Sequence, residues 1–441
     1  MRRGRGPIHG QCAADELRIP RDAGARRTRD DGPGSFTRET FVAKAQHRPM
    51  ISFDAARAML ADEPLPALLV DRDAFDRNVR AAASKARAAG KTLRVATKSV
   101  RSVALLDRAL ALAEGAYRGL LAYSVEEAVL LAGRGHDDVL VAYPTVDRHA
   151  LDAVATRAPE RVTLMVDELA HVEAIHDAAK RRGTRLRVAI ELDVSFRPEL
   201  RGDVHLGPRR SPLRDASSVL ALARSIATRP SLVLTALMGY EAHIAGVPDS
   251  LAMRAFKRVA WPRVLEKRAE TVEALRRSSL LPRIVNGGGS GSVSATLSDP
   301  SVTEGTIGSG LLCAHLFDRF DADPYEPALF FALEAARIPD ASHVTCRGGG
   351  YVASGPPGLD RLPLPVVPAG LTYLSREAAG EVQTPLDVRR ATEIPRVGDP
   401  VLFRPAKSGE IAERFREHVF FSSGRVAGRA PTYRGEGWCF Y

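Results

Sequence analysis

Short apolar segments alternate with longer amphipathic segments through the middle of the chain. The amphipathic segments, such as 103–114, 125–135 and 215–229, carry charges on one face and Ala, Leu or Val on the other, which predicts helices. Eight apolar segments predict strands, at 93–97, 119–124, 139–144, 161–167, 186–193, 232–241, 283–289 and 302–310. Eight strands alternating with helices are typical of an α/β fold, a (β/α)8 TIM barrel. An open doubly wound sheet is the alternative, because parallel strands buried on both faces look alike in the two folds.

The pattern changes on either side of this region. From residue 325 Pro and Gly become frequent and short strand-like segments follow, which predicts a C-terminal β domain over 325–441. Residues 66–90 resemble a strand followed by an amphipathic helix, and we assign them to a barrel domain over 60–324. Residues 1–48 are rich in Arg, Gly and Pro without apolar periodicity, which predicts a disordered basic tail, and Met50 is an alternative start.

The charge is uneven along the chain. The net charge is +10, and residues 1–48 contribute +5 of it, from 11 Lys and Arg against 6 Asp and Glu. With 6% aromatic residues and no recognised nucleic-acid-binding module, we expect no nucleic-acid partner. No apolar run is long enough to span a membrane, and no apolar stretch follows the first basic residues as in a secretory signal. The four cysteines are scattered, which favours a reducing, cytoplasmic location.

Polar side chains gather where the predicted strands end. Lys98 ends the first strand, and a lysine there is either a solvated tip or a nucleophile held over a pocket. The ends of the later strands carry Tyr123, Ser124, Tyr143, Asp167, Glu191, Asp193, Tyr240, Glu241, His243 and Asn286. Because barrel enzymes build their active sites at the carboxyl ends of the strands, these residues mark the predicted active-site face.

Two glycine-rich turns follow the seventh and eighth predicted strands. They are NGGGSGS at 286–292 and GSG at 308–310. Successive glycines let backbone N–H groups surround a phosphate, and barrels often bind phosphate with these two loops. An ordinary flexible loop is the alternative. A lysine opposite a phosphate site suits pyridoxal 5'-phosphate, whose aldehyde would form a Schiff base with Lys98 and whose ring withdraws electrons.

These segments resemble a known family. PALLVDRDAFDRNV, LRVATKSV, GYEAH and NGGGSGS are similar to the alanine-racemase-like barrels, the fold type III pyridoxal phosphate enzymes. The branch they resemble is the D-threonine aldolase and D-serine dehydratase-like one. Segments 207–212, 380–386 and 406–415 resemble its amino acid deaminase/aldolase subgroup, so the resemblance covers about residues 60–437.

The resemblance implies roles for individual residues. Lys98 would be the cofactor lysine. The phosphate would be held by Gly288, Gly289 and Ser290, with Gly308 and Ser309 assisting, and Tyr240 and His243 would line the cofactor ring. The alternatives are a packing role for Tyr240 and a histidine bonded to backbone for His243.

The resemblance is incomplete in the C-terminal domain. Family aldolases and dehydratases carry a divalent metal there, bound by a histidine and a later His-x-Cys-like pair. Here only His418 matches, and Tyr433 and Gly435 stand where the later ligands would be. One imidazole is a poor divalent site, so we predict no metal ligand set, although Glu417 or Glu436 could contribute. His418 and Tyr433 then become candidate catalytic acids or bases, with a plain strand residue as the alternative for His418.

The function implied is a pyridoxal-phosphate-dependent lyase acting on D-β-hydroxy amino acids, by aldol cleavage or deamination. An amino-acid racemase is the alternative, and a non-catalytic cofactor carrier a third, disfavoured by the second domain. The substrate would be a small amino acid, with Arg197, Arg209 or Arg210 as candidate partners of its carboxylate. A homodimer is expected by analogy alone.

Overall fold

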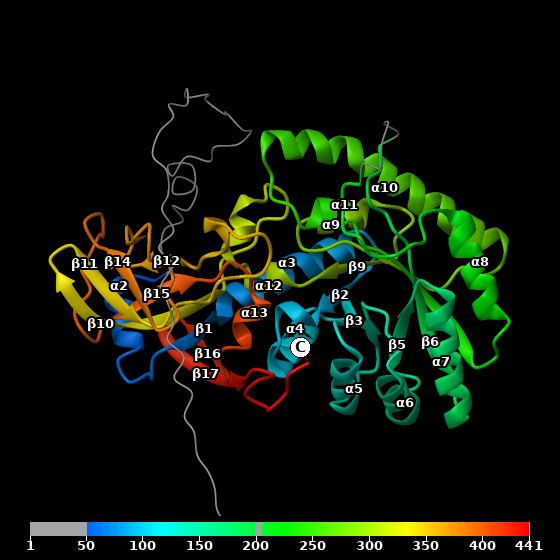
Figure 1. The fold of residues 1–441 in the computed structure, drawn as a ribbon, viewed down its shortest axis with the longest axis horizontal. Coiled ribbons are helices and arrows are strands. Elements are labelled where there is room, and N and C mark those ends of the chain that lie inside the picture. Colours follow the sequence, from blue (N-terminus) through cyan, green and yellow to red (C-terminus); the bar gives the residue numbers. More distant parts are fainter. Residues whose placement is uncertain (1–50, 199–204, 441) are drawn as a thin grey trace, which may run out of the picture. The chain divides into compact units, whose positions relative to one another are not determined.

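The computed structural model describes residues 51–198 and 205–440, which all belong to one compact unit (Figure 1). The predicted tail at 1–48 lies outside the described residues. None of the described helices is both long and apolar enough to cross a membrane. The described chain forms a closed barrel and, beside it, a separate sheet that is mostly antiparallel.

Eight parallel strands close the barrel in sequence order, which confirms the barrel and rejects the open sheet. They are β2 (Thr92–Ala96), β3 (Tyr117–Ala122), β4 (Val139–Val141), β5 (Val162–Val166), β6 (Leu186–Glu191), β7 (Leu232–Gly239), β8 (Ile284–Gly287) and β9 (Glu304–Ile307). Each lies within or beside one of the eight predicted segments. The ring closes where β2 pairs with β9, Val95 beside Ile307.

Helices cover the outside of the barrel. The longer ones are α3 (Arg72–Ala88), α4 (Val103–Leu112), α5 (Val125–Gly133), α6 (Arg148–Arg157), α7 (Leu169–Arg182), α8 (Ala216–Ala227) and α10 (Leu251–Arg277). Several begin at an Asp or Ser whose side chain accepts a hydrogen bond from the first turn, as Asp147 does from the amide of Ala150. Their buried faces are the Ala, Leu and Val stripes that the sequence predicted.

The second sheet runs β13-β14-β11-β10-β1-β16-β17, with β15 pairing β10 and β12. Its strands are β1 (Ala67–Asp71), β10 (Leu329–Asp340), β11 (His343–Arg347), β12 (Leu364–Val367), β13 (Thr372–Tyr373), β14 (Gln383–Asp387), β15 (Pro400–Arg404), β16 (Glu417–Ser422) and β17 (Arg425–Pro431). The strand that precedes the barrel, β1, lies inside this sheet between β10 and β16. All five of its residues are buried, and its backbone N–H and C=O groups find partners in the strands on both edges.

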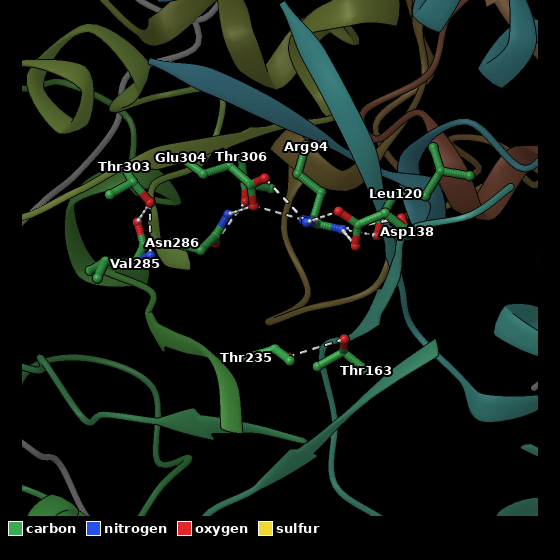
Figure 2. Close-up of polar contacts among 10 residues, drawn as sticks. All are labelled: Arg94, Leu120, Asp138, Thr163, Thr235, Val285, Asn286, Thr303, Glu304 and Thr306. Atoms are coloured by element: carbon green, nitrogen blue, oxygen red, sulfur yellow. Dashed lines mark hydrogen bonds and ion pairs between the residues drawn. The ribbon is translucent and has the colours of Figure 1, made fainter. Parts of the chain in front are cut away.

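The barrel interior has an apolar layer and a polar layer. Side chains from β4 to β7 form the apolar layer, namely Leu140, Met165, Ala189, Ala236 and Met238. The polar layer lies toward the amino ends of the strands and centres on Arg94 (Figure 2). Arg94 is fully buried and pairs with Glu304 at 2.7 Å and with Asp138 at 2.9 Å. Gly119 lets it reach Asp138, since a Cβ there would lie 2.4 Å from Arg94 Nη1.

Candidate active site

Lys98 stands at the carboxyl end of β2, where the sequence placed it. The strand ends at Ala96 and a single 3-10 turn, Thr97–Ser99, carries the lysine. Thr97 and Ser99 are buried while Lys98 is exposed, so the turn holds its backbone in the core and directs the amine outward. The amine lies 3.5 Å from Tyr143 Oη, at the end of β4.

The guanidinium of Arg210 lies beside Tyr143 and is fixed by hydrogen bonds. The Arg210 guanidinium lies 4.7 Å from the centre of the Tyr143 ring. Arg210 donates to Glu191 Oε1 at 2.5 Å and to the carbonyl of Ala142 at 3.0 Å, so its position depends on buried partners. Burial raises the pKa of Glu191, and the charge of Arg210 opposes that rise. Of the three predicted carboxylate partners, Arg197 pairs with Asp193 at 3.2 Å and Arg209 is exposed.

The two predicted phosphate loops are joined to each other. Ser290 Oγ accepts hydrogen bonds from the amides of Gly308, at 3.1 Å, and Gly310, at 2.9 Å. The hydroxyl of Ser309 lies 2.9 Å from that of Ser99, next to Lys98. The sequence-predicted residues Lys98, Ser290, Gly308 and Ser309 therefore share one face of the barrel, and two amides converge on one oxygen as they would on a phosphate oxygen.

A buried ion network supports the glycine loop from behind. Glu241 Oε2 accepts from the amide of Gly288 at 3.1 Å and pairs with Arg268, which also contacts Asp299 at 3.1 Å. Burial would raise the pKa of Glu241, but the Arg268 charge and several hydrogen bonds hold it below its ordinary value. The amide of predicted Gly288 is thus engaged by the protein, and this residue shapes the loop, with a φ of +85° that favours glycine.

The two residues predicted to line the cofactor ring lie close to this loop. A Cβ on Gly289 would lie 3.2 Å from Tyr240 Cε2, so the tyrosine ring lies against the loop. Burial raises the pKa of Tyr240 to about 12. His243 is 4% exposed, and neither of its ring nitrogens has a hydrogen-bond partner among the described residues. The alternative of a backbone-bonded His243 therefore finds no support, and burial lowers its pKa to about 4.

The two candidate acids or bases from the second sheet are deeply buried. His418, on β16, has no exposed surface and no hydrogen-bond partner among the described residues, and burial lowers its pKa to about 4. Tyr433 donates its hydroxyl to Glu127 Oε1 at 2.9 Å. Burial raises the pKa of Glu127 to about 7, against the hydrogen bonds from Thr97, the Tyr123 amide and Tyr433.

The C-terminal segment contacts the Lys98 turn directly. A Cβ on Gly409 would lie 1.8 Å from the Lys98 carbonyl oxygen, so only glycine allows this approach. The amide of Tyr433 donates to the carbonyl of Arg101 at 2.9 Å, and Arg101 pairs with Glu413 at 2.6 Å. Sequence reasoning missed Glu127, although the spacing Ser124-x-x-Glu127 is a helix-start signal, and Ser124 does cap the helix.

Residues 51–198 and 205–440 contain no cluster of three or more His, Cys, Asp or Glu side chains able to hold a metal ion. Within these residues His418 is therefore not part of such a cluster. Glu436, one of the two compensating candidates, pairs with Arg134 at 2.6 Å. The other, Glu417, pairs with Arg429 at 2.6 Å.

Comparison with known proteins adds a family match to this geometry. Residues 70–312 match the family model described as alanine racemase, N-terminal domain. A 3-hydroxy-D-aspartate aldolase of Paracoccus denitrificans strain Pd 1222 is 29% identical over 232 residues, 52% of this chain and 54% of the relative. A second one, of Paracoccus denitrificans, is 28% identical over 181 residues, 40% of this chain and 42% of the relative. The chain spans about half the length of the curated relatives it matches.

Solved structures extend the likeness in fold to the second sheet. D-threonine aldolase from Filomicrobium marinum superposes with a TM-score of 0.75 at 24% identity, covering 87% of this chain and 97% of that one. D-threo-3-hydroxyaspartate dehydratase from Delftia sp. HT23 superposes with a TM-score of 0.65 at 18% identity, covering 85% and 98%. At these identities the likeness concerns the arrangement of barrel and sheet.

Proposed function

The chain belongs to the alanine racemase N-terminal domain family, and we propose that it is a pyridoxal-phosphate-dependent lyase acting on D-β-hydroxy amino acids, by aldol cleavage or deamination. The observation that carries the proposal is one shared face: Lys98 and the Ser290, Gly308 and Gly310 cradle lie at the same end of the barrel, linked through Ser99 and Ser309. The names of the aldolase and dehydratase relatives support the choice of a lyase over a racemase.

The residues present fit the cofactor. The loops after β8 and β9 pack tightly against neighbouring protein atoms, because a Cβ on Gly291 would lie 2.4 Å from the Ala245 carbonyl oxygen and one on Gly308 would lie 2.9 Å from Ala96 Cβ. Such backbone can approach a phosphate closely. Tyr240, which lies against Gly289, and His243, whose ring nitrogens have no hydrogen-bond partner in the part of the chain that the structure describes, would flank the ring.

In the proposed reaction the cofactor would withdraw electrons, and the protein would bind the cofactor and move protons. Bound pyridoxal phosphate supplies an electron-withdrawing ring joined to the substrate amino group, which stabilises negative charge at the α-carbon. Lys98 would hold the cofactor and afterwards carry a proton at Nζ. The loop at Gly289 and Ser290 and the turn at Gly308 and Ser309 would anchor the phosphate, and Ser290 Oγ joins them by accepting from the amides of Gly308 and Gly310. Glu241 keeps the glycine loop in shape by accepting from the Gly288 amide.

The first experiment is the absorbance spectrum of the protein with pyridoxal phosphate, beside Lys98→Ala. We expect an imine band in the parent that is absent in the variant. Parent protein is then incubated with D-threonine, D-serine and D-3-hydroxyaspartate, with aldehyde, keto acid and ammonia measured, and with the L-enantiomers as controls. Samples dialysed against EDTA and samples given Mn²⁺ are assayed in parallel.

Each result separates the candidate functions. An imine band with aldehyde or keto-acid release from D-substrates alone supports the lyase. An imine band with deuterium exchange at the α-carbon, loss of optical rotation and no cleavage would replace it with the racemase. A parent protein without an imine band would overturn the proposal.

A further inference from the structure

The phenol of Tyr143 lies beside the amine of Lys98 at the barrel mouth. Tyr143 follows β4 at the mouth of the barrel, and its hydroxyl lies 3.5 Å from Lys98 Nζ. The residue is 37% exposed, so a small molecule at the mouth can reach it. The phenol therefore stands beside the amine that the proposed function places at the reacting centre.

Two cations act on this phenol. Lys98 lies at its oxygen and Arg210 above its ring, and Glu191 fixes Arg210 in turn. Burial would raise the pKa of Tyr143, but the charges of Lys98 and Arg210 lower it below its ordinary value. In Tyr240 and Tyr433, by contrast, burial raises the pKa. A cation on each side favours the phenolate, which is the form that accepts a proton.

The other two candidate bases, Tyr433 and His418, are buried. The Tyr433 hydroxyl is used in its hydrogen bond to Glu127, and only 1% of the residue is exposed. His418 is fully buried in the second sheet. A general base must reach the proton it removes, at hydrogen-bond distance or through one water molecule. Of these three side chains only Tyr143 is exposed beside Lys98.

We propose that Tyr143 is the general base that removes the proton of the substrate's β-hydroxyl group during aldol cleavage. This inference rests on the proposed function. The hydroxyl proton moves to Tyr143 Oη, the O–H electrons form the carbonyl of the released aldehyde, and the Cα–Cβ bond breaks. Its electron pair stays on the α-carbon, where bound pyridoxal phosphate would delocalise the negative charge. The proton then returns to the α-carbon through Lys98 Nζ, 3.5 Å from the phenol oxygen, which restores Tyr143.

The test is Tyr143→Phe, with Tyr373→Phe as the matched control. Tyr373 lies in the second sheet, where its hydroxyl donates to the Pro363 carbonyl at 2.8 Å. We expect Tyr143→Phe to slow the cleavage of D-threonine by about 10²- to 10⁴-fold, the usual contribution of a general base. Because D-alanine has no β-hydroxyl group, its α-deuterium exchange should stay within about threefold of the parent rate. The imine band should remain, and Tyr373→Phe should behave as the parent.

A second measurement needs neither cofactor nor turnover. Phenolate absorbance of the cofactor-free protein is followed as the pH rises, and the tyrosine that ionises first should be missing from Tyr143→Phe. In Arg210→Met that first ionisation should move to higher pH, while Tyr373→Phe should leave it in place. The groups facing Tyr143 in this titration are Lys98, Arg210 with Glu191, and Tyr240.

The outcomes separate this inference from the proposed function. A parent with an imine band and full cleavage by Tyr143→Phe would overturn the base and leave the lyase intact. Equal slowing of D-threonine cleavage and D-alanine exchange would also overturn it, since a base for the β-hydroxyl acts in only one of them. A parent with no imine band would overturn both, whereas a parent that deaminates D-substrates without any aldol cleavage would overturn the base alone. An unchanged first phenol ionisation in Tyr143→Phe would contradict the electrostatic argument.

Discussion

The two ends of the barrel treat buried polar groups in opposite ways. At the amino end, Arg94 has no exposed surface, and its side chain donates to Glu304, to Asp138 and to the carbonyl of Leu120 (Figure 2). Asn286 donates to Glu304 and accepts from Thr306, so this layer is closed on itself. At the carboxyl end, the two ring nitrogens of His243 are buried without a hydrogen-bond partner among the described residues.

This difference in hydrogen bonding distinguishes polar groups that stabilise the fold from polar groups that can bind another molecule. A buried polar group without a partner costs free energy, so a closed network stabilises the fold, whereas unpartnered groups remain available for another molecule. The polar layer belongs to the scaffold, although its residues are as ionisable as those of the mouth. Burial and charge alone therefore do not identify a site.

The largest effect should come from breaking the closed layer. Arg94→Ala leaves Glu304 buried without its cation, and breaking a buried ion pair on one side costs roughly 3–5 kcal/mol. Urea unfolding at pH 7 measures the loss. Arg276→Ala is the control, because the Arg276–Glu273 pair lies on the surface of α10 and its loss should be undetectable. Equal losses in the two variants would show that the polar layer is not structural.

The buried imidazole of His418 should make the stability of the protein depend on pH, with the loss in acid. The pKa of His418 falls from 6.5 to about 4 on folding, so the unfolded chain binds the extra proton between these values. Stability present above pH 6.5 is therefore lost as the pH falls toward 4, by about 3 kcal/mol. His418→Leu should remove this part of the acid sensitivity, seen as a shallower fall of the unfolding free energy between pH 7 and pH 4.5.

His243→Leu provides the comparison for that measurement. The pKa of His243 is also lowered to about 4 by burial, so each variant should remove a similar share of the acid sensitivity. Parallel pH dependence in the parent and both variants would contradict the burial argument. An imine band retained in His418→Leu would leave the cofactor site independent of this histidine.

The sequence predicted the barrel and its active-site face because both are local properties. Apolar runs mark buried parallel strands, and a residue just past the end of a run lies at the same mouth whatever the loops do. Lys98 and Ser290 are close in space for this reason, although 192 positions separate them. Their roles as cofactor lysine and phosphate ligand stay predictions, as do those of Tyr240, His243 and Gly289. Asn286, which was expected on the active-site face, lies inside β8 and belongs instead to the polar layer around Arg94.

The contacts that the sequence could not predict join distant segments. β10 was missed, because FFALEAAR suits a helix as well as a strand. The placement of β1 in the second sheet depends on β10 and β16, which lie more than 250 residues away. The burial of Tyr433 depends on Glu127, a residue whose spacing from Ser124 already suggests a helix cap. Neither partner can be inferred from the neighbours of the other.

A single hydrogen bond between barrel and C-terminal segment should have a smaller, pH-dependent effect. Tyr433→Phe removes the donor to Glu127 Oε1, which should cost about 1–2 kcal/mol. Burial raises the pKa of Glu127 to about 7, and loss of the donor raises it further. A raised carboxyl pKa stabilises the protonated protein and destabilises the ionised one, so the deficit should grow as the pH rises from 6 to 8.

Unfolding at pH 6 and pH 8 tests this, with Tyr373→Phe as the matched control. Tyr373 donates to a backbone carbonyl, which does not titrate, so its deficit should be the same at the two values. A deficit of Tyr433→Phe that does not change with pH would mean that Glu127 stays in one protonation state across this range.

The smallest expected effect on stability is that of Gly289→Ala, which tests whether the glycine loop at the barrel mouth is shaped to bind the cofactor. In Gly289→Ala the new Cβ would lie 3.2 Å from both Ala245 Cβ and Tyr240 Cε2, so these neighbours must move by a few tenths of an ångström. We expect under about 1 kcal/mol of lost stability but roughly tenfold weaker binding of pyridoxal phosphate, measured by fluorescence titration. Gly133→Ala, at the end of α5 with open space around it, should change neither. If Gly289→Ala lost stability and kept its cofactor affinity, the loop would belong with the closed layer around Arg94, as a packing element and not a binding one.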